Sequence, residues 1–331
     1  MKKKISIVLL TFNGEKYIRQ CLDSVLGQDS GVEDVEMIII DDVSADSTLC
    51  ILEEYRQRYP ENIRLIPRKV HSAEAKETNR NIGVEQAEGE YILFLDQDDW
   101  YAQGTFKALL KVTEHRKDLD YIEFRYCNVN EDGSPYQEEK FVGKEFEVYE
   151  ISNEEERKEY ARQGILPGAT FVWNKMYRRD FLLNHHIIHN EGEQKTGFSD
   201  NFFSGLLVLY VNKMAKLNIP FYHYRNYIGS YSHDSKTNSK VQFERCKAGI
   251  AFYDECLYRK LDKKNREMVE FIFTRTFLVK TFWKFLMNYD PIPYNILEYI
   301  QKEMLIRCPD YNQNSIMRDK EEIKGLLILA A

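Results

Sequence analysis

Hydrophobic and polar positions follow two alternating patterns along the first hundred residues. Continuous apolar runs of strand length occupy Ile5–Phe12, Val35–Ile40, Ile63–Ile66 and Tyr91–Leu95. Between them, apolar residues recur at helical spacing in Tyr17–Gly27, Thr48–Tyr59 and Ala73–Gln86. Unbroken apolar strands are typical of a parallel sheet covered on both faces. Their alternation with helices predicts a doubly wound α/β sheet.

Beyond Trp100 the pattern changes and becomes mainly helical. It predicts a strand over Tyr121–Val129 with a turn at Asn130, and helices over Phe106–His115, Glu154–Gln163, from near Asn174 to Leu183, and Phe202–Val211. Later helices are expected over Phe243–Lys260, Asn265–Tyr289, Ile296–Arg307 and Asp319–Leu329. Because the stretch Ser230–Ser239 is polar, we expect two parts, 1–235 and 236–331.

The composition of the chain argues against some classes of protein. The chain has 331 residues, 43% hydrophobic residues, 8 prolines and a net charge of −7, which argues against disorder and against nucleic acid as a partner. The six cysteines form no CxxC pair, which favours reduced thiols and a cytoplasmic location. Met1–Lys4 and the following apolar run imitate a signal peptide, but the run is short and we interpret it as the first strand.

Polar residues follow three of the predicted strands directly. They are Thr11–Glu15, the pair Asp41 and Asp42, and Asp96–Asp99. Ligands of open parallel sheets bind at the carboxyl ends of the strands. Crowded carboxylates repel one another unless a cation lies among them, and hard oxygen ligands suit Mg²⁺ or Mn²⁺ completed by substrate phosphates. The alternative is that Asp99 only caps a helix. Because the sequence contains no GxGxxG and no P-loop motif, metal and side chains must hold any phosphate.

Several segments together resemble the family 2 glycosyltransferases, in the branch that builds bacterial capsular polysaccharide, other surface polysaccharide or teichoic acid. They are Ser6–Asn13, Tyr17–Gln28, Ile38–Thr48, Asn79–Gly83, Gly89–Asp99 and Val172–Leu182, within 4–235. The resemblance implies a GT-A fold, a Rossmann-like mixed sheet with a C-terminal helical region. Residues 1–100 would form the nucleotide-sugar half and 101–235 the acceptor half. It also implies inverting, metal-dependent transfer from a UDP-sugar to a hydroxyl of a glycan or lipid-linked acceptor.

The resemblance also assigns site residues. It places Thr11, Phe12, Asn13, Glu15, Asp41, Arg80, Asp96 and Gln97 around the nucleotide. Asp41 would meet the uracil edge, and Asp98 would bind Mn²⁺ or Mg²⁺. An aromatic ring can stack on a base and a carboxylate can accept from a base N–H. The alternative for Phe12 is a core residue at the end of its strand.

The family's general base is the Asp of a Glu-Asp pair at the start of a helix, after a Glu-Gly segment. Here Glu191-Gly192 precedes Ser199-Asp200, so the resemblance makes Asp200 the base, with Ser199 in place of the usual Glu. Inverting transfer needs one such base to take the acceptor hydroxyl proton. The alternative is that Ser199 or Asp200 only caps the helix.

The segment Tyr222–His233 resembles the family's closing loop. Arg225, Ser230 and Ser232 would contact the diphosphate and His233 would lie at the metal, although a lone His is more often a surface residue. His185, His186 and His189 have poor spacing for a metal site, and we expect an acceptor-side loop. The charged segment His71–Arg80 departs from the family and would alter donor preference, with Lys76 a candidate phosphate contact.

The segment Phe271–Tyr289 has seven aromatic residues, three cations and no acid. It predicts either a helix lying on an anionic membrane surface, peripheral at the inner face of the membrane, or one that packs in a bundle or homo-oligomer interface. Two other functions stay open at this stage. A haloacid dehalogenase-type phosphohydrolase would carry Asp-x-Asp on its first strand, and a silent binding protein could keep the fold.

Overall fold

The computed structural model describes residues 3–72, 79–137, 143–166, 171–189, 199–228, 239–288 and 294–317. Two units can be separated. The sheet unit contains Met1–Glu150, Val172–Ile188 and Asn212–Ile228, and the helical unit contains Ile151–Phe171, His189–Val211 and Gly229–Ala331. The expected division at residue 235 therefore cuts across the helical unit, which gathers residues 151–171 and 189–211 with the C-terminal helices.

Four parallel strands form the first half of the sheet unit. They are β1 (Ile5–Thr11), β2 (Val35–Asp41), β3 (Ile63–Pro67) and β4 (Tyr91–Asp96), in the spatial order β3-β2-β1-β4. All seven residues of β2 are buried, as expected for a strand covered on both faces. This confirms the strands predicted from the first hundred residues.

The sheet continues beyond β4 with mixed pairing. Its other strands are β5 (Trp100–Tyr101), β6 (Tyr121–Val129), β7 (Phe146–Glu150), β8 (Lys175–Arg178) and β9 (Lys213–Arg225). The order after β4 is β8-β6-β9-β5, and β7 pairs with β9. Because β8 runs antiparallel to both β4 and β6, the sheet is mixed, as the GT-A expectation requires.

The predicted helix from near Asn174 is wrong over residues 175–178. These residues form β8, and helix α6 begins only at Arg179 and ends at Asn184. The Met176 and Tyr177 side chains are fully buried in the sheet, so pairing with β4 and β6 outweighs the local helical pattern.

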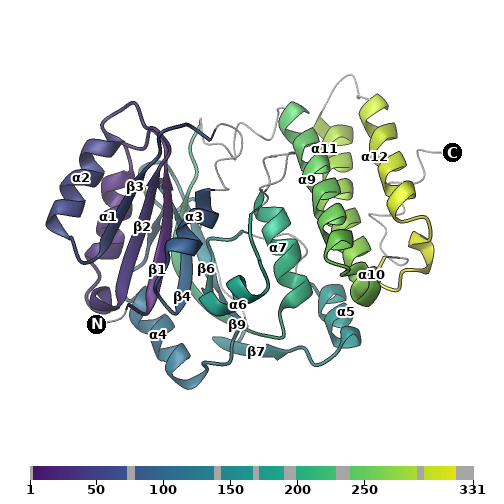
Figure 1. Ribbon diagram of the computed structural model, residues 1–331, viewed down its shortest axis with the longest axis horizontal. Coiled ribbons are helices and arrows are strands. Elements are labelled where there is room, and N and C mark those ends of the chain that lie inside the picture. Colours follow the sequence, from purple (N-terminus) through teal and green to yellow (C-terminus); the bar gives the residue numbers. More distant parts are fainter. Residues whose placement is uncertain are drawn as a thin grey trace. The chain divides into compact units, whose positions relative to one another are not determined.

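Helices cover both faces of the parallel strands. They are α1 (Ile18–Leu26), α2 (Thr48–Arg58), α3 (Asn79–Gln86) and, later, α4 (Thr105–His115), with the short 3₁₀ helix η1 (Val32–Asp34). Figure 1 shows α1 and α2 on one side of β1 and β2 and α3 on the other. Helix α3 approaches β1 closely at Gly83, where a Cβ atom would lie 2.3 Å from Val8 Cγ1. Of the predicted helix Ala73–Gln86, residues 73–78 lie outside the described residues.

The described elements of the helical unit are helices from three separate segments of the chain. They are α5 (Glu154–Arg162), α7 (Ser199–Tyr210), α9 (Ser239–Tyr258), α10 (Asp262–Ile272), the π-helix η3 (Phe273–Val279), α11 (Lys280–Asn288), α12 (Tyr294–Arg307) and the 3₁₀ helix η4 (Tyr311–Gln313). The single helix predicted over 265–289 is wrong in part, because a π-helical segment interrupts it. The predicted helix Asp319–Leu329 lies outside the described residues.

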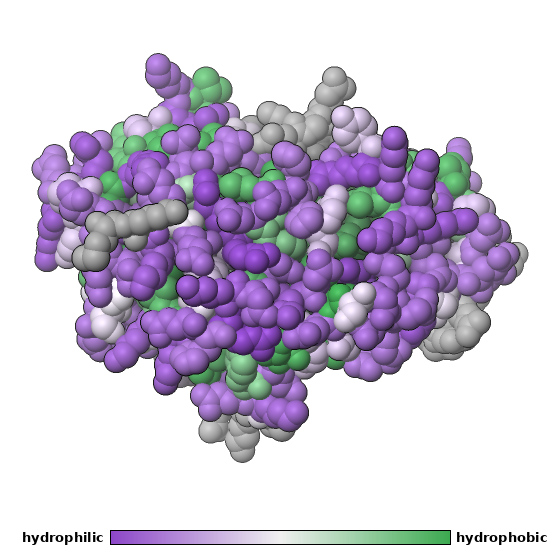
Figure 2. All heavy atoms as spheres, turned by 60° about the horizontal axis from the view of Figure 1, so that its bottom comes forward, coloured by the Kyte–Doolittle hydropathy of each residue, from purple (hydrophilic) through white to green (hydrophobic). Residues whose placement is uncertain are grey.

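The aromatic segment beginning at Phe271 packs inside the helical unit. Its phenylalanines at 271, 273, 277, 282 and 285 are all fully buried. This burial favours packing over a membrane-surface role for these rings, while Met287, Tyr294 and Ile306 are exposed. Figure 2 shows a face on which hydrophilic side chains dominate and hydrophobic ones form small patches. Among the described helices, none is long and apolar enough to cross a membrane.

Candidate functional site

The carboxyl ends of β1, β2 and β4 lie next to one another in the sheet unit (Figure 1). In the parallel register Thr11 pairs with Asp41 and Leu10 pairs with Asp96. The backbone N–H of Asp42 also donates to the Thr11 carbonyl at 2.8 Å. The structure therefore brings the predicted strand-end residues to one edge of the sheet.

Asp41 is held by the chain itself. Its carboxylate accepts from Thr11 Oγ1 at 3.1 Å, from Ser44 Oγ at 2.5 Å and from the Ser44 N–H at 3.1 Å. Its residue is only 1% exposed. Between these anchors Val43 has φ of +68°, a left-handed conformation that a β-branched residue rarely adopts. The loop after β2 is thus fixed in a strained conformation, and the predicted contact of Asp41 with a base stays a prediction.

Asn13 and Glu15 tie the loop after β1 to the start of α2. Asn13, at φ of +49°, accepts from the Ala45 N–H at 2.8 Å through Oδ1. Glu15 Oε2 accepts from the Ser47 N–H at 2.9 Å. Hydrogen bonds from Thr48 and the Glu15 backbone hold the pKa of Asp46 below its usual range, although burial alone would raise it. These hydrogen bonds within the chain fix the shape of the loop.

Phe12 is exposed at the end of β1, so the alternative of a core residue is wrong. Its residue is 39% exposed. The Gln97 side chain pairs with its backbone, because Oε1 accepts from the Phe12 N–H at 2.8 Å and Nε2 donates to its carbonyl at 3.0 Å. A Cβ at Gly14 would lie 2.4 Å from Gln97 Oε1, so this close pairing requires glycine there. Gln97 thus positions Phe12.

His71 stacks on Phe12 and was missed as a site residue. The ring centroids lie 4.4 Å apart at an interplanar angle of 28°. Nδ1 of His71 lies 2.9 Å from Oδ2 of the buried Asp42, which also accepts from Ser72 Oγ at 2.6 Å and from Asn79 Nδ2 at 3.2 Å through its other oxygen. The sequence does not show that Asp42 pairs with a segment 30 residues away, and for this reason His71 was not predicted beside Phe12. Asp42 therefore anchors residues 71–72 beside the exposed ring.

Arg80 and Asp96, both assigned to the nucleotide by the resemblance, pair directly. Arg80 Nη2 donates to Asp96 Oδ1 at 2.6 Å. The Arg80 side chain is 6% exposed and its guanidinium carbon lies 5.8 Å from the Phe94 ring centroid. The Asp96 side chain is 31% exposed, so a charge-neutralised carboxylate faces the edge of the sheet.

Asp99 is the buried member of the acidic cluster. Its carboxylate accepts from Tyr222 Oη and from the Arg225 N–H, each at 2.8 Å, so it does not cap α4. Burial, followed by the charges of Asp98 and Asp96, raises the pKa of Asp99 well above its usual range. The Asp99 carboxyl is therefore buried beside the charges of Asp98 and Asp96.

Arg225 lies beneath the cluster. Its guanidinium carbon is 4.5 Å from the Tyr17 ring centroid and 4.6 Å from that of Trp100. Nε donates to the Asp98 carbonyl at 2.8 Å, and the two Nη atoms donate to the Glu131 carbonyl and to Gln20 Oε1. With 4% exposure, Arg225 orders the loop that carries Asp98. Its predicted contact with a diphosphate stays a prediction.

Asp98 is the carboxylate of this cluster that fits a divalent cation. It is partly exposed, and its Oδ2 accepts from Tyr227 Oη at 3.1 Å. Within the described ranges, no three His, Cys, Asp or Glu side chains could enclose a metal ion. Mg²⁺ and Mn²⁺ typically take one or two protein carboxylates and complete their shell with phosphate oxygens. The oxygen donors present fit such a shared site.

Asp200 belongs to the helical unit, as the second residue of α7. Its Oδ1 lies 3.7 Å from Nδ1 of His189, whose ring is fully buried. The expected acceptor-side loop of the three histidines stays a prediction. His185 and His186 follow α6 in the sheet unit. Ser230, Ser232 and His233, like Glu191-Gly192 and Lys76, lie outside the described residues.

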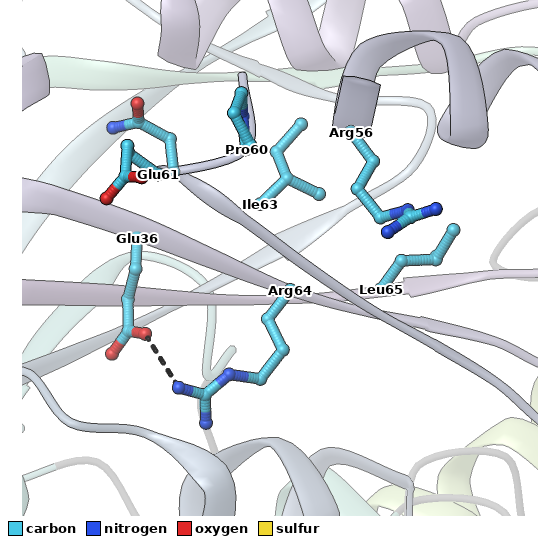
Figure 3. A pocket seen from close by; sticks show the side chains of 8 residues that line it. Glu36, Arg56, Pro60, Glu61, Ile63, Arg64 and Leu65 are labelled. Atoms are coloured by element: carbon cyan, nitrogen blue, oxygen red, sulfur yellow. Dashed lines mark ion pairs between the residues drawn. The ribbon is translucent and has the colours of Figure 1, made fainter. Parts of the chain in front are cut away.

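A different hollow lies at the amino end of β2 and β3. Figure 3 shows Arg64 reaching toward Glu36, at 4.0 Å. Its lining residues are Glu36, Arg56, Pro60, Glu61, Asn62, Ile63, Arg64 and Leu65. Glu36 accepts from Ser6 Oγ at 2.5 Å and from the Glu88 N–H at 2.7 Å. This hollow lies at the edge opposite the predicted site.

Known proteins resemble the chain in sequence and fold. The family model described as Glycosyl transferase family 2 matches residues 6–185. EpsH of Bacillus subtilis (strain 168) is 27% identical over 275 residues, covering 81% of this chain and 74% of EpsH. Poly(ribitol-phosphate) beta-N-acetylglucosaminyltransferase TarS of Staphylococcus aureus (strain MW2) is 30% identical over 226 residues, covering 67% of this chain and 35% of TarS.

A comparison of folds agrees with these sequence similarities. The crystal structure of S. aureus TarS 1–349 in complex with UDP-GlcNAc has a TM-score of 0.60 at 20% identity, covering 94% of this chain and 93% of that one. This likeness supports the GT-A fold, and the family match decides against a phosphohydrolase. The chain belongs to glycosyl transferase family 2 and is a glycosyltransferase.

Proposed function

We propose that the chain is an inverting, metal-dependent hexosyltransferase that moves a sugar from a UDP-sugar to a hydroxyl of a cell-surface glycan or a lipid-linked acceptor. One relative supports this choice, since TarS is named a poly(ribitol-phosphate) beta-N-acetylglucosaminyltransferase and one of its crystal structures is a complex with UDP-GlcNAc. A lipid-linked acceptor implies work in the cytoplasm at the inner face of the membrane, in polysaccharide biosynthesis of the cell envelope.

One observation carries the proposal. Asp96, Asp98 and Asp99 crowd together at the end of β4, and the exposed ring of Phe12 lies at the end of the adjacent β1. An aromatic platform beside an acidic, cation-requiring edge is suited to a nucleoside diphosphate. A base can stack on the Phe12 ring, and the Arg80–Asp96 pair can offer hydrogen bonds to a ribose.

Asp98 is the proposed ligand of Mn²⁺ or Mg²⁺, together with His233. When bound, the cation neutralises charge on the departing diphosphate. The loop after β4 is kept in place by Arg225 and Tyr222, so Asp98 stays partly exposed while Asp99 beside it is buried. Ser230 and Ser232 are proposed to contact the diphosphate from the closing loop.

Asp200 is the proposed general base. In inverting transfer it accepts the proton of the acceptor hydroxyl while the acceptor oxygen bonds to the anomeric carbon and the bond to the diphosphate breaks. Its side chain is 30% exposed and can therefore contact the hydroxyl of an acceptor that binds from solvent. Ser199, beside it, keeps a hydroxyl where the family carries a second carboxylate.

A two-stage experiment tests this function. A thermal-shift screen of nucleotide sugars with Mn²⁺ or Mg²⁺ identifies the donor, and release of UDP is then measured for the wild type and Asp200→Asn. We expect UDP-sugars to stabilise both proteins and turnover to fall about 10²–10⁴-fold in the variant. Unchanged turnover in Asp200→Asn would remove Asp200 as the base, and no response to any UDP-sugar would contradict the donor assignment.

A further inference from the structure

His189 is a buried polar side chain at the start of α7. It is fully buried, and its ring stacks on Phe203 with centroids 4.9 Å apart at 25°. Nδ1 lies 3.0 Å from Ser199 Oγ and 3.7 Å from Asp200 Oδ1. All four residues belong to the helical unit. One ring therefore contacts the first turn of the helix on which the proposed base stands.

The position of the imidazole hydrogen follows from these neighbours. A carboxylate only accepts hydrogen bonds, whereas a serine hydroxyl can donate or accept. With Asp200 Oδ1 nearby, Nδ1 is assigned as N–H, which donates to Ser199 Oγ with the carboxylate behind it. The buried ring thus directs a positive dipole toward both residues.

Burial differs sharply across this group. The His189 side chain is 0% exposed, whereas that of Asp200 is 30% exposed. The Asp200 side chain therefore lies near a buried imidazole and is still partly exposed to solvent. A partly exposed base beside a buried donor matches the general arrangement in which a third group orients a catalytic base.

We propose that His189 is a positioning residue for Asp200, acting through Nδ1–H and the Ser199 hydroxyl. This rests on the proposed role of Asp200. The imidazole holds the carboxylate in the orientation in which it meets the acceptor hydroxyl. During transfer the acceptor proton passes to Asp200, which becomes a neutral acid, and His189 keeps its own proton throughout.

Two substitutions of His189 test whether Nδ1 or Nε2 is the atom that positions Asp200. The amide nitrogen of Asn can take the place of Nδ1, whereas that of Gln reaches the place of Nε2. We expect His189→Gln to lower kcat about 10- to 100-fold, as for a misplaced catalytic group, with the KM for donor changed less than about twofold. His189→Asn should restore most of kcat. Ser199→Ala, a milder change, should lower kcat by a smaller factor.

Phe203→Leu serves as the matched control, because it removes the ring stack and keeps Nδ1. It should lower the melting temperature with kcat retained. If His189→Asn and His189→Gln lose kcat equally, in proportion to their lowered melting temperatures, His189 only packs. If Ser199→Ala keeps the wild-type kcat, His189 does not act through the Ser199 hydroxyl. If Asp200→Asn keeps full turnover, the proposed base itself fails. If only Asp200→Asn loses turnover, the base stands and the positioning role of His189 fails.

Discussion

Two buried acids at opposite edges of the parallel sheet, Glu36 and Asp99, have different surroundings. At the amino edge, Glu36 is 6% exposed and accepts from Ser6 Oγ and from the N–H groups of Glu88 and Gly89. At the carboxyl edge, Asp99 accepts two hydrogen bonds but faces the charges of Asp98 and Asp96, which with burial raise its pKa.

The difference indicates where a ligand is needed. A buried carboxylate surrounded by donors stabilises the fold by itself, as Glu36 does by joining β1, β2 and the turn before β4. Carboxylates that face one another repel, and a cation among them relieves the repulsion. The hollow beside Glu36 is therefore a weaker functional candidate than the crowded edge.

The largest expected stability change comes from Glu36→Gln. The amide oxygen of Gln is a weaker acceptor than the carboxylate for the donors Ser6 and Gly89, and its N–H₂ would take the place of Oε2 beside Arg64, so we expect the free energy of unfolding to fall by about 2 kcal/mol. Denaturant unfolding measures this, and UDP affinity of the folded variant should equal that of the wild type. A folded Glu36→Gln protein with lost UDP binding would place functional chemistry at the amino edge and break the comparison.

A smaller change is expected from Asp42→Asn at the carboxyl edge. It removes an acceptor from His71 and Ser72, so we expect a loss of about 1 kcal/mol and weaker UDP binding, because the segment beside Phe12 loosens. Calorimetric titration measures the binding. Val43→Gly is the control, since it relieves a positive φ and keeps these hydrogen bonds. Wild-type affinity in Asp42→Asn would show that residues 71–72 lie outside the base site.

The smallest effect is a pH dependence at Glu267 in the helical unit. Burial would raise its pKa, but hydrogen bonds from Lys158 and Ser315 hold it below the usual range. Because the folded-state pKa is lowered, this contribution to stability is present above the unfolded pKa of about 4.5 and is lost as pH falls through the folded value. Glu267→Gln should therefore cost less than about 1 kcal/mol at pH 7 and a smaller amount near pH 3. A cost that is constant between these pH values in urea unfolding would contradict the ion pair.

The sequence allowed the four parallel strands and their acidic ends to be predicted, because long apolar runs and the residues directly after them are local signals. It did not reveal β7, β8 or β9, whose pairing depends on distant partners, such as Tyr121 with Met214. The same limit hid the stack of His71 on Phe12 and the burial of Arg225 between Tyr17 and Trp100. Contacts between residues far apart in the chain decide these features.

We propose above all that Asp98 binds the cation of a metal-dependent nucleotide site at the carboxyl edge of the sheet. Calorimetric titration of UDP, with Mn²⁺ and with a chelator, into the wild type, Asp98→Asn and the Glu36→Gln control tests it most directly. We predict that Mn²⁺ strengthens binding about tenfold or more in the wild type and in Glu36→Gln, and not in Asp98→Asn. Equal strengthening by Mn²⁺ in all three proteins would contradict the account.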